Sequence, residues 1–370
     1  MASSINHPLL SYQPLRLLFQ LSYTTTIILR LPYYALVALV PFLRPNPRWS
    51  AKQTFMTHLF YPILDLTSRV GITETLTLEK GKEGDNFQTI SPSDLDVYKG
   101  PLVSEVVKPA TIGGTWFPHA PADVAGKTIV LYFHGGGFIQ GDGRTANCGP
   151  LAKRLLNKGG ADAVFSVQYR LSGYGGINPF PAALQDAVSS YLFILNEVKV
   201  PASQIVVGGD SAGANLTTAL LRYLQEFGAA INVPVPKCAI LLSPWVAPFQ
   251  HDTKNSPQRK TDFVPYTYPQ WGSRAYTQGL SDAASNTYIT PLGNPFATPV
   301  PLFINIASAE LLYEQVQQWA GEMRGISGNV VELYHELDAV HDTLLVAGLL
   351  GFEKSAADVA LEIGKFVRRY

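Results

Sequence analysis

The segment Ile205-Val206-Val207-Gly208-Gly209-Asp210-Ser211-Ala212-Gly213 joins a short apolar run to residues 212–227, which have helical periodicity. The apolar run is typical of a buried strand. A G-x-S-x-G sequence between a strand and a helix places its serine at a tight, strained turn, where flanking side chains would collide with both elements. The stretch therefore predicts an α/β fold with Ser211 as the candidate nucleophile and Asp210 as part of the supporting motif.

Apolar runs of strand length recur on both sides of this turn, at residues 128–133, 163–169, 204–208, 238–243, 302–306 and 330–334. Helical patterns lie between several of them, for example at residues 181–196. Strands that alternate with helices predict a mostly parallel central sheet flanked by helices on both faces.

The organisation of the chain changes between residues 80 and 101, where Gly, Ser, Asp and Lys are frequent and apolar periodicity is weak. We predict an N-terminal helical segment and cap over residues 1–95 and an α/β core over residues 96–370. After the sixth strand, residues 246–298 lose the strand and helix pattern. This insertion is expected to cover the carboxyl edge of the sheet, where α/β active sites lie.

A second glycine-rich motif, His134-Gly135-Gly136-Gly137, directly follows a predicted strand. Its glycines let backbone N–H groups approach a substrate and stabilise the oxyanion of a tetrahedral intermediate. We expect an oxyanion hole at Gly135, Gly136, Gly137 and Ala212, with His134 bracing the loop by hydrogen bonding. The alternative is a plain glycine turn or a phosphate cradle, but the chain has neither G-x-x-x-x-G-K nor G-x-G-x-x-G.

Three histidines, His251, His335 and His341, follow Ser211, as the serine-acid-histidine order of this fold requires. His251 stands too early, at the start of the insertion, and His335 lies in a predicted strand, where a structural role is expected. His341 follows the last strand in a loop that could reach the serine. It is therefore the predicted general base.

The acid that orients His341 is expected on the loop after residues 302–306, at the end of a different strand. Glu310 is the first carboxylate there and Glu314 is the second candidate. Asp338 and Asp342 are closer to His341 in sequence, but a carboxylate on the same loop would hold the imidazole less rigidly.

Composition excludes several classes of function. The chain has 370 residues, of which 46% are hydrophobic, and its 28 basic residues equal its 28 acidic residues, so no excess charge is available for nucleic acid. Two cysteines, Cys148 and Cys238, cannot form a disulfide framework, which favours a reducing compartment. We expect neither a cofactor nor a metal.

The N-terminal residues 17–43 form two uncharged, mostly apolar runs separated by Arg30. Each is shorter than the about 20 residues that span a bilayer. Because Pro32 breaks one helix and can begin another, we predict two short helices that meet near residues 30–32. They are lid helices, a membrane-surface contact or anchor, or, as the weakest alternative, a cleaved leader. The expected location is the cytoplasm or the endoplasmic-reticulum membrane, without secretion.

Together, the HGGG loop and the GDSAG turn resemble the hormone-sensitive-lipase-like branch of the α/β hydrolases. Tyr169-Arg170-Leu171, residues 179–183 (PFPAA) with Asp186, and Ser243-Pro244-Trp245 also resemble motifs of that branch, so the likeness covers about residues 101–370. It implies the α/β-hydrolase fold and a Ser211-Glu310-His341 triad. Two features depart from the branch: Glu310 replaces the more usual aspartate, and residues 172–177 replace a common A-P-E.

The N-terminal stretches at residues 30–32 and 44–50 resemble fungal members of this branch, which include sterol-ester deacetylases and enzymes of secondary-metabolite clusters. This likeness implies a small-molecule substrate. It would be a bulky apolar ester, often an acetate, or a polyketide-like compound. Three functions stay open at this point. They are a carboxylic-ester hydrolase, a biosynthetic acyltransferase or cyclase on the same fold, and a ligand receptor that has lost catalysis.

Overall fold

A central sheet of eight strands organises the protein, as seen in a computed structural model that describes residues 6–250, 256–278 and 280–370. The order across the sheet is β1-β2-β4-β3-β5-β6-β7-β8. The two pairings of β2 are antiparallel and all the others are parallel. The mostly parallel sheet predicted from the sequence is thus confirmed. The strands are β1 (Phe87–Ile90), β2 (Ile112–Phe117), β3 (Ile129–Phe133), β4 (Ala163–Gln168), β5 (Ile205–Asp210), β6 (Cys238–Leu242), β7 (Leu302–Ala307) and β8 (Val331–Glu336).

The six predicted strands correspond to β3 through β8, whereas β1 and β2 were not predicted. β1 has only four residues, and β2 contains Gly113 and Gly114, which carry no side chain to create an apolar pattern. Both lie at the antiparallel edge of the sheet. β1 precedes residue 95, where we placed the domain boundary, and yet it is part of the sheet.

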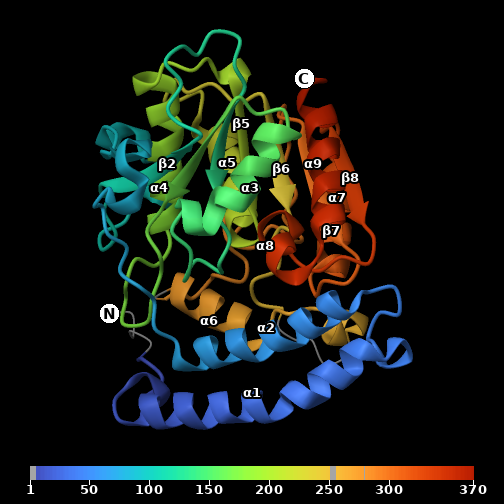
Figure 1. The fold of residues 1–370 in the computed structure, drawn as a ribbon. Coiled ribbons are helices and arrows are strands. Elements are labelled where there is room, and N and C mark those ends of the chain that lie inside the picture. The colour runs from blue at the N-terminus through green and yellow to red at the C-terminus, as the bar shows by residue number, and fades with distance from the viewer. Residues whose placement is uncertain (1–5, 251–255, 279) are drawn as a thin grey trace.

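Helices cover both faces of the sheet (Figure 1). One face packs against α4 (Ala182–Leu192), α5 (Ala212–Phe227) and α7 (Tyr313–Arg324), and the other against α3 (Thr145–Asn157), α8 (Thr343–Leu350) and α9 (Glu353–Val367). Side chains alternate between the two cores along each strand. In β3, for example, Leu131 joins the first core and Val130 the second.

The N-terminal segment forms two long helices, α1 (Leu15–Leu39) and α2 (Ala51–Val70), which pack on each other. The predicted pair of short helices is wrong, because α1 continues through Pro32. Proline removes one helical hydrogen bond, but here it stands on the exposed side, where water can satisfy the freed carbonyl. In the described residues, no helix is both long and apolar enough to cross a membrane.

Layers of helix separate α1 from the sheet. In Figure 1, α1 is outermost, α2 lies next to it, and α6 (Thr267–Tyr276) from the predicted insertion lies between α2 and the core. Asp65 ties the three helices together, because it accepts hydrogen bonds from Tyr23 of α1 (2.5 Å) and Thr267 of α6 (2.7 Å).

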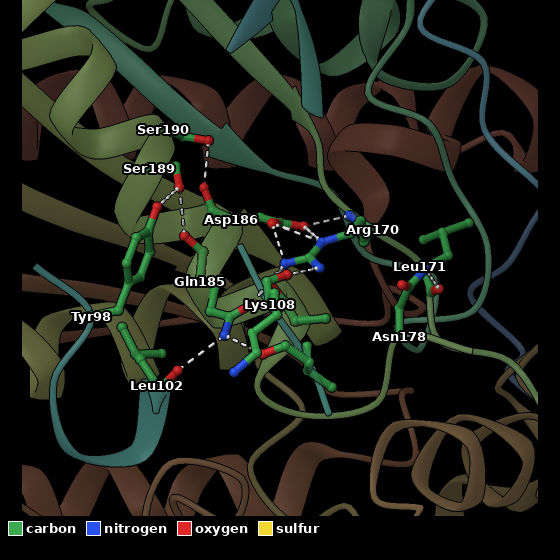
Figure 2. A network of polar contacts seen from close by, with 12 residues as sticks. Tyr98, Leu102, Lys108, Arg170, Leu171, Asn178, Gln185, Asp186, Ser189 and Ser190 are labelled. Carbon is green, nitrogen blue, oxygen red and sulfur yellow. Dashed lines mark hydrogen bonds and ion pairs between the residues drawn. The ribbon is translucent and has the colours of Figure 1, made fainter. Parts of the chain in front are cut away.

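A buried ion pair fixes the loop after β4 to α4 (Figure 2). The Arg170 guanidinium lies 2.8 Å from Oδ1 of Asp186, and the Arg170 backbone N–H donates to Oδ2 of the same carboxylate at 2.8 Å. The neighbouring Gln185 amide donates to the carbonyls of Leu102 and Val107, each at 3.0 Å. Burial raises the pKa of Asp186, and the Arg170 charge opposes that shift.

Replacing Asp186 with alanine is expected to lower the free energy of unfolding by about 3–5 kcal/mol, because it leaves the guanidinium of Arg170 buried without its counter-charge. Urea denaturation followed by circular dichroism measures this loss. Asp358→Ala, which breaks the exposed pair between Lys354 and Asp358, serves as the control and should leave the unfolding midpoint unchanged. Equal stability of the two variants would contradict the role assigned to the buried pair.

Candidate active site

Ser211 occupies the turn between β5 and α5, with φ 51° and ψ −114°. A non-glycine residue rarely adopts such a positive φ, so the turn is strained. Hydrogen bonds on both sides hold it: the Ser211 N–H donates to Leu242 O (2.9 Å), and Trp245 N–H donates to Ser211 O (3.0 Å). Gly213 is required because a Cβ there would overlap the carbonyl oxygen of Phe133.

Ser211 lines a cavity of about 430 Å³ at the carboxyl edge of the sheet. The three glycines of the HGGG loop and His341 line the same cavity. Ala212, the first residue of α5, is fully buried beside it, and the first N–H groups of a helix have no partner within the helix. Most other walls are apolar or aromatic, and they come from Leu64, Trp245, Phe263, Val264, Tyr268, Pro269, Leu345 and Val346.

The HGGG loop turns sharply after β3. Gly136 has φ 98°, and a Cβ there would overlap the carbonyl oxygen of Gln140. His134 braces this loop, because its Nδ1 lies 2.7 Å from Gly135 O. The His134 ring also stacks on the ring of Tyr169, with 4.3 Å between the ring centroids, and the Tyr169 hydroxyl donates to His134 O at 2.7 Å. Burial lowers the pKa of His134 to about 4, so its imidazole is neutral at neutral pH.

The structure brings His341 and Glu310 into direct contact. Nδ1 of His341 lies 2.7 Å from Oε2 of Glu310, and both side chains are buried. Glu310 follows β7, and its other oxygen accepts the N–H of Ala307 at 3.2 Å. Glu314, the second candidate for the acid, also lines the cavity, from the first turn of α7.

The remaining candidates lie elsewhere. His335 is exposed on β8, where Nδ1 lies 3.2 Å from the hydroxyl of Tyr313. Asp338 is turned towards the N-terminal segment, because it accepts from Asn46 (2.8 Å) and pairs with Arg48 (2.9 Å). His251 lies outside the described residues.

Asp342, which the sequence offered only as a less favoured candidate for the acid, contacts the other nitrogen of the His341 ring. Nε2 of His341 lies 3.1 Å from Oδ2 of Asp342, and in the described part of the chain no hydrogen bond joins Nε2 to the Ser211 hydroxyl. Asp342 adopts a left-handed backbone, with φ 51° and ψ 50°, which aspartate tolerates better than most residues. Its position directly after His341 was the available signal, since a left-handed turn can fold it back onto the ring.

A second carboxyl group, that of Asp210, is within hydrogen-bonding reach of Asp342. Its Oδ1 accepts a hydrogen bond from the Tyr132 hydroxyl at 2.6 Å, and the backbone N–H of Gly135 also favours the charged form of this carboxyl. Burial, followed by the Asp342 charge, raises the pKa of Asp210 well above its usual value. Because two buried carboxyls so close cannot both ionise cheaply, the Asp342 charge makes Asp210 hold its proton more tightly.

The carboxylates of Asp342 and Glu310 set the pKa of His341. Burial by itself lowers the pKa of His341, but the charges and hydrogen bonds of Asp342 and Glu310 outweigh it and raise that pKa well above the usual value. The ring is therefore an imidazolium in this arrangement. To accept a proton from Ser211, it must become neutral, and Nε2 must leave Asp342.

Asp342→Asn is expected to move the acidic limb of the kcat/KM profile to lower pH. A histidine accepts a proton only when it is neutral, so activity that depends on His341 as a base should fall as the pH drops through its pKa. Removing the Asp342 charge lowers that pKa, and asparagine also tolerates the left-handed backbone. A pH series with p-nitrophenyl acetate measures the shift. Asp338→Asn makes the same charge change on the same loop and should leave the limb in place; a limb that Asp342→Asn does not move contradicts this role.

Comparison with known proteins finds a matching family and several similar solved structures. A family described as "alpha/beta hydrolase fold" matches residues 130–345, more than half of the sequence. A crystal structure described as a hormone-sensitive lipase from a metagenome library is 29% identical, with a TM-score of 0.56, and the match covers 70% of this chain and 82% of that one. A thermostable esterase from Pseudomonas putida (18% identity, TM-score 0.63, covering 85% and 95% of the two chains) shares the fold.

Curated relatives carry names of ester-cleaving enzymes. An acetyl-hydrolase of Streptomyces hygroscopicus is 31% identical over 201 residues, which are 53% of this chain and 62% of that protein. Esterase LipI of Mycobacterium tuberculosis is 37% identical over 117 residues, or 30% and 34% of the two chains. The match thus spans between about a third and three fifths of the length of these two relatives.

These likenesses agree with the strained Ser211 turn, the glycine loop and the His341–Glu310 contact, all of which lie at the carboxyl edge of one mostly parallel sheet. This chain belongs to the α/β-hydrolase family, in its hormone-sensitive-lipase-like branch.

Proposed function

We propose that this protein hydrolyses a carboxylic ester through an acyl-enzyme on Ser211. The Ser211 oxygen attacks the ester carbonyl while Nε2 of His341 accepts its proton, and Glu310 holds the imidazolium through Nδ1. Backbone N–H groups of Gly136, Gly137 and Ala212 stabilise the oxyanion, with Gly135 shaping the loop. His341 then protonates the departing alcohol. Water, deprotonated by His341, attacks the acyl-enzyme, releases the acid and restores Ser211.

One observation carries this proposal. The strained Ser211 turn, the HGGG loop and His341 with its Glu310 partner, which come from four separate segments of the chain, line or adjoin a single cavity. A glycine turn with only a structural role would need neither a serine at positive φ nor a buried histidine–carboxylate contact beside it.

The cavity supports an apolar substrate. Apolar and aromatic side chains from α2, α6, α8 and the insertion form most of its walls. We infer a short acyl group, such as acetyl, on a bulky apolar alcohol, in line with the name of the Streptomyces relative and with the fungal secondary-metabolite enzymes that the N-terminal motifs resemble. Both cysteines are free and buried, which suits the expected reducing compartment.

The test is intact-protein mass spectrometry after a fluorophosphonate probe, combined with hydrolysis of p-nitrophenyl acetate and p-nitrophenyl octanoate. We expect one probe adduct per chain, located on the peptide that contains Ser211, and faster turnover of the acetate. Labelling without turnover of either ester would instead favour an acyltransferase or cyclase that keeps water out. A chain that is neither labelled nor active would contradict the nucleophile assignment.

A further inference from the structure

The outer face of α1 is apolar and exposed. We define it by the residues of α1 that point away from α2 and are at least half exposed: Leu17, Leu18, Leu21, Ile28, Leu29, Tyr33, Leu36 and Leu39. Their spacing follows the helical period, and no charged residue of α1 is among them. One exposed polar residue, Thr25, lies in the same row, and its hydroxyl donates to the carbonyl of Leu21 at 2.9 Å. The opposite face, with Ile27, Tyr34 and Val37, is buried against α2. The solvent side of an ordinary surface helix is polar, so an apolar row of this length marks an interaction surface.

Charge is distributed unevenly along the chain. Five of the 28 basic residues and none of the 28 acidic ones precede Asp65, so residues 1–64 carry a net charge of +5 and the rest of the chain −5. Arg48 and Lys52 form ion pairs with Asp338 and Glu353. Within the described ranges, Arg16 and Arg30 of α1 form no ion pair with a carboxylate. Arg44, five residues beyond the end of α1, also has no carboxylate partner, and it donates to the carbonyls of Ala38 (2.9 Å) and Trp49 (2.6 Å).

We propose that the outer face of α1 docks on an anionic membrane surface, with the helix lying in the plane of the interface. Leucines and aromatic residues of the outer face enter the boundary between headgroups and acyl chains, and the basic residues of the segment are attracted to anionic headgroups. A second copy of this chain is the other possible occupant. Charge disfavours it, because a symmetric dimer through α1 would bring two segments of +5 together.

The layers beneath α1 connect this surface to the cavity. α1 packs on α2, whose Leu64 lines the cavity, and the Ser68 hydroxyl of α2 lies 2.7 Å from that of Thr267 in α6. α6 contributes Tyr268 and Pro269 to the same wall. Docking through α1 therefore places the cavity on the membrane side of the molecule. An apolar ester dissolved in the bilayer would reach the site without crossing bulk water, a consequence that rests on the proposed function.

Vesicle flotation of the full chain tests the docking. Vesicles of phosphatidylcholine alone are compared with vesicles that contain about 30 mol % phosphatidylserine. We expect the wild type to float with the anionic vesicles and to bind the neutral ones more weakly. The double variant Leu21→Glu with Ile28→Glu should lower the bound fraction about tenfold or more, because it places two carboxylates in the apolar face. Arg16→Gln with Arg30→Gln should reduce binding to the anionic vesicles only.

Two further variants distinguish the effect of added charge from the effect of lost apolar contact on α1. Leu95→Glu with Val106→Glu adds the same charge at two exposed apolar positions outside α1 and should bind like the wild type. Leu21→Gln with Ile28→Gln adds no charge and should still bind more weakly, because it removes apolar contact. All variants should hydrolyse p-nitrophenyl acetate at the wild-type rate in vesicle-free solution. Because flotation does not depend on hydrolysis, an inactive wild type would contradict the proposed function without affecting the docking test.

Three outcomes would overturn the docking proposal. The wild type could stay at the bottom of the gradient with both kinds of vesicle. The control pair at residues 95 and 106 could lose binding as strongly as the α1 pair. Sedimentation velocity without vesicles could show a dimer that Leu21→Glu with Ile28→Glu dissociates, which would assign the outer face of α1 to a second copy of the chain.

Discussion

Replacing Ser211 with alanine is expected to lower kcat/KM for p-nitrophenyl acetate by about 10⁴- to 10⁶-fold. The substitution removes the only atom that can form the acyl-enzyme, while the oxyanion donors and the cavity walls remain in place. These donors and walls are the source of the small residual rate. The measurement is steady-state hydrolysis, with the spontaneous rate subtracted and the protein quantified by absorbance.

Folding of the Ser211→Ala variant must be checked separately, because the turn is strained. Alanine at φ 51° keeps the strain, so the free energy of unfolding should change little. Ser243→Ala is the control for the strained backbone: Ser243 is another buried serine at positive φ, directly after β6, and its hydroxyl makes only a long contact, 3.4 Å, with the N–H of Asp342. The Ser243→Ala variant should keep most of the hydrolytic activity and the fluorophosphonate labelling. An active Ser211→Ala variant would show that the reaction proceeds without the acyl-enzyme.

The second large effect is expected for Glu310→Gln, which should lower kcat by about 10³- to 10⁴-fold. The amide keeps the size of the side chain but removes the charge that stabilises the imidazolium. It can also present an N–H to Nδ1 and so favour the wrong tautomer of His341. The apparent KM should change little, because Glu310 lies behind the ring and does not contact a bound ester.

Glu314→Gln is the matched control, since Glu314 lines the cavity and stands four residues further along the chain, in the first turn of α7. It should retain near wild-type kcat. Comparing Glu310→Gln with Asp342→Asn then separates the two carboxylates that contact His341. The first should lower kcat across the whole pH range, and the second should mainly shift the acidic limb. A large loss of kcat in Glu314→Gln together with a small one in Glu310→Gln would assign the orienting role to Glu314.

Local sequence determined most of the framework. Strand-length apolar runs predicted β3 through β8, because buried parallel strands carry apolar side chains on both faces and therefore read as continuous runs. The sequence also predicts the close backbone contacts at Gly213 and Gly136, because a Cβ at either position would overlap a backbone carbonyl oxygen. Short or glycine-rich edge strands carry no such pattern, and β1 and β2 were missed for that reason.

The tertiary structure decided the electrostatics of the site and the shape of the N-terminal segment. That Glu310 contacts Nδ1 of His341, and that Asp342 occupies Nε2 beside Asp210, depends on the ends of three different strands meeting in one buried volume. Likewise, α1 passes through Pro32 because packing on α2 stabilises it beyond local propensity. Spacing and propensity act within a few residues, whereas charge coupling and burial depend on which distant segments become neighbours.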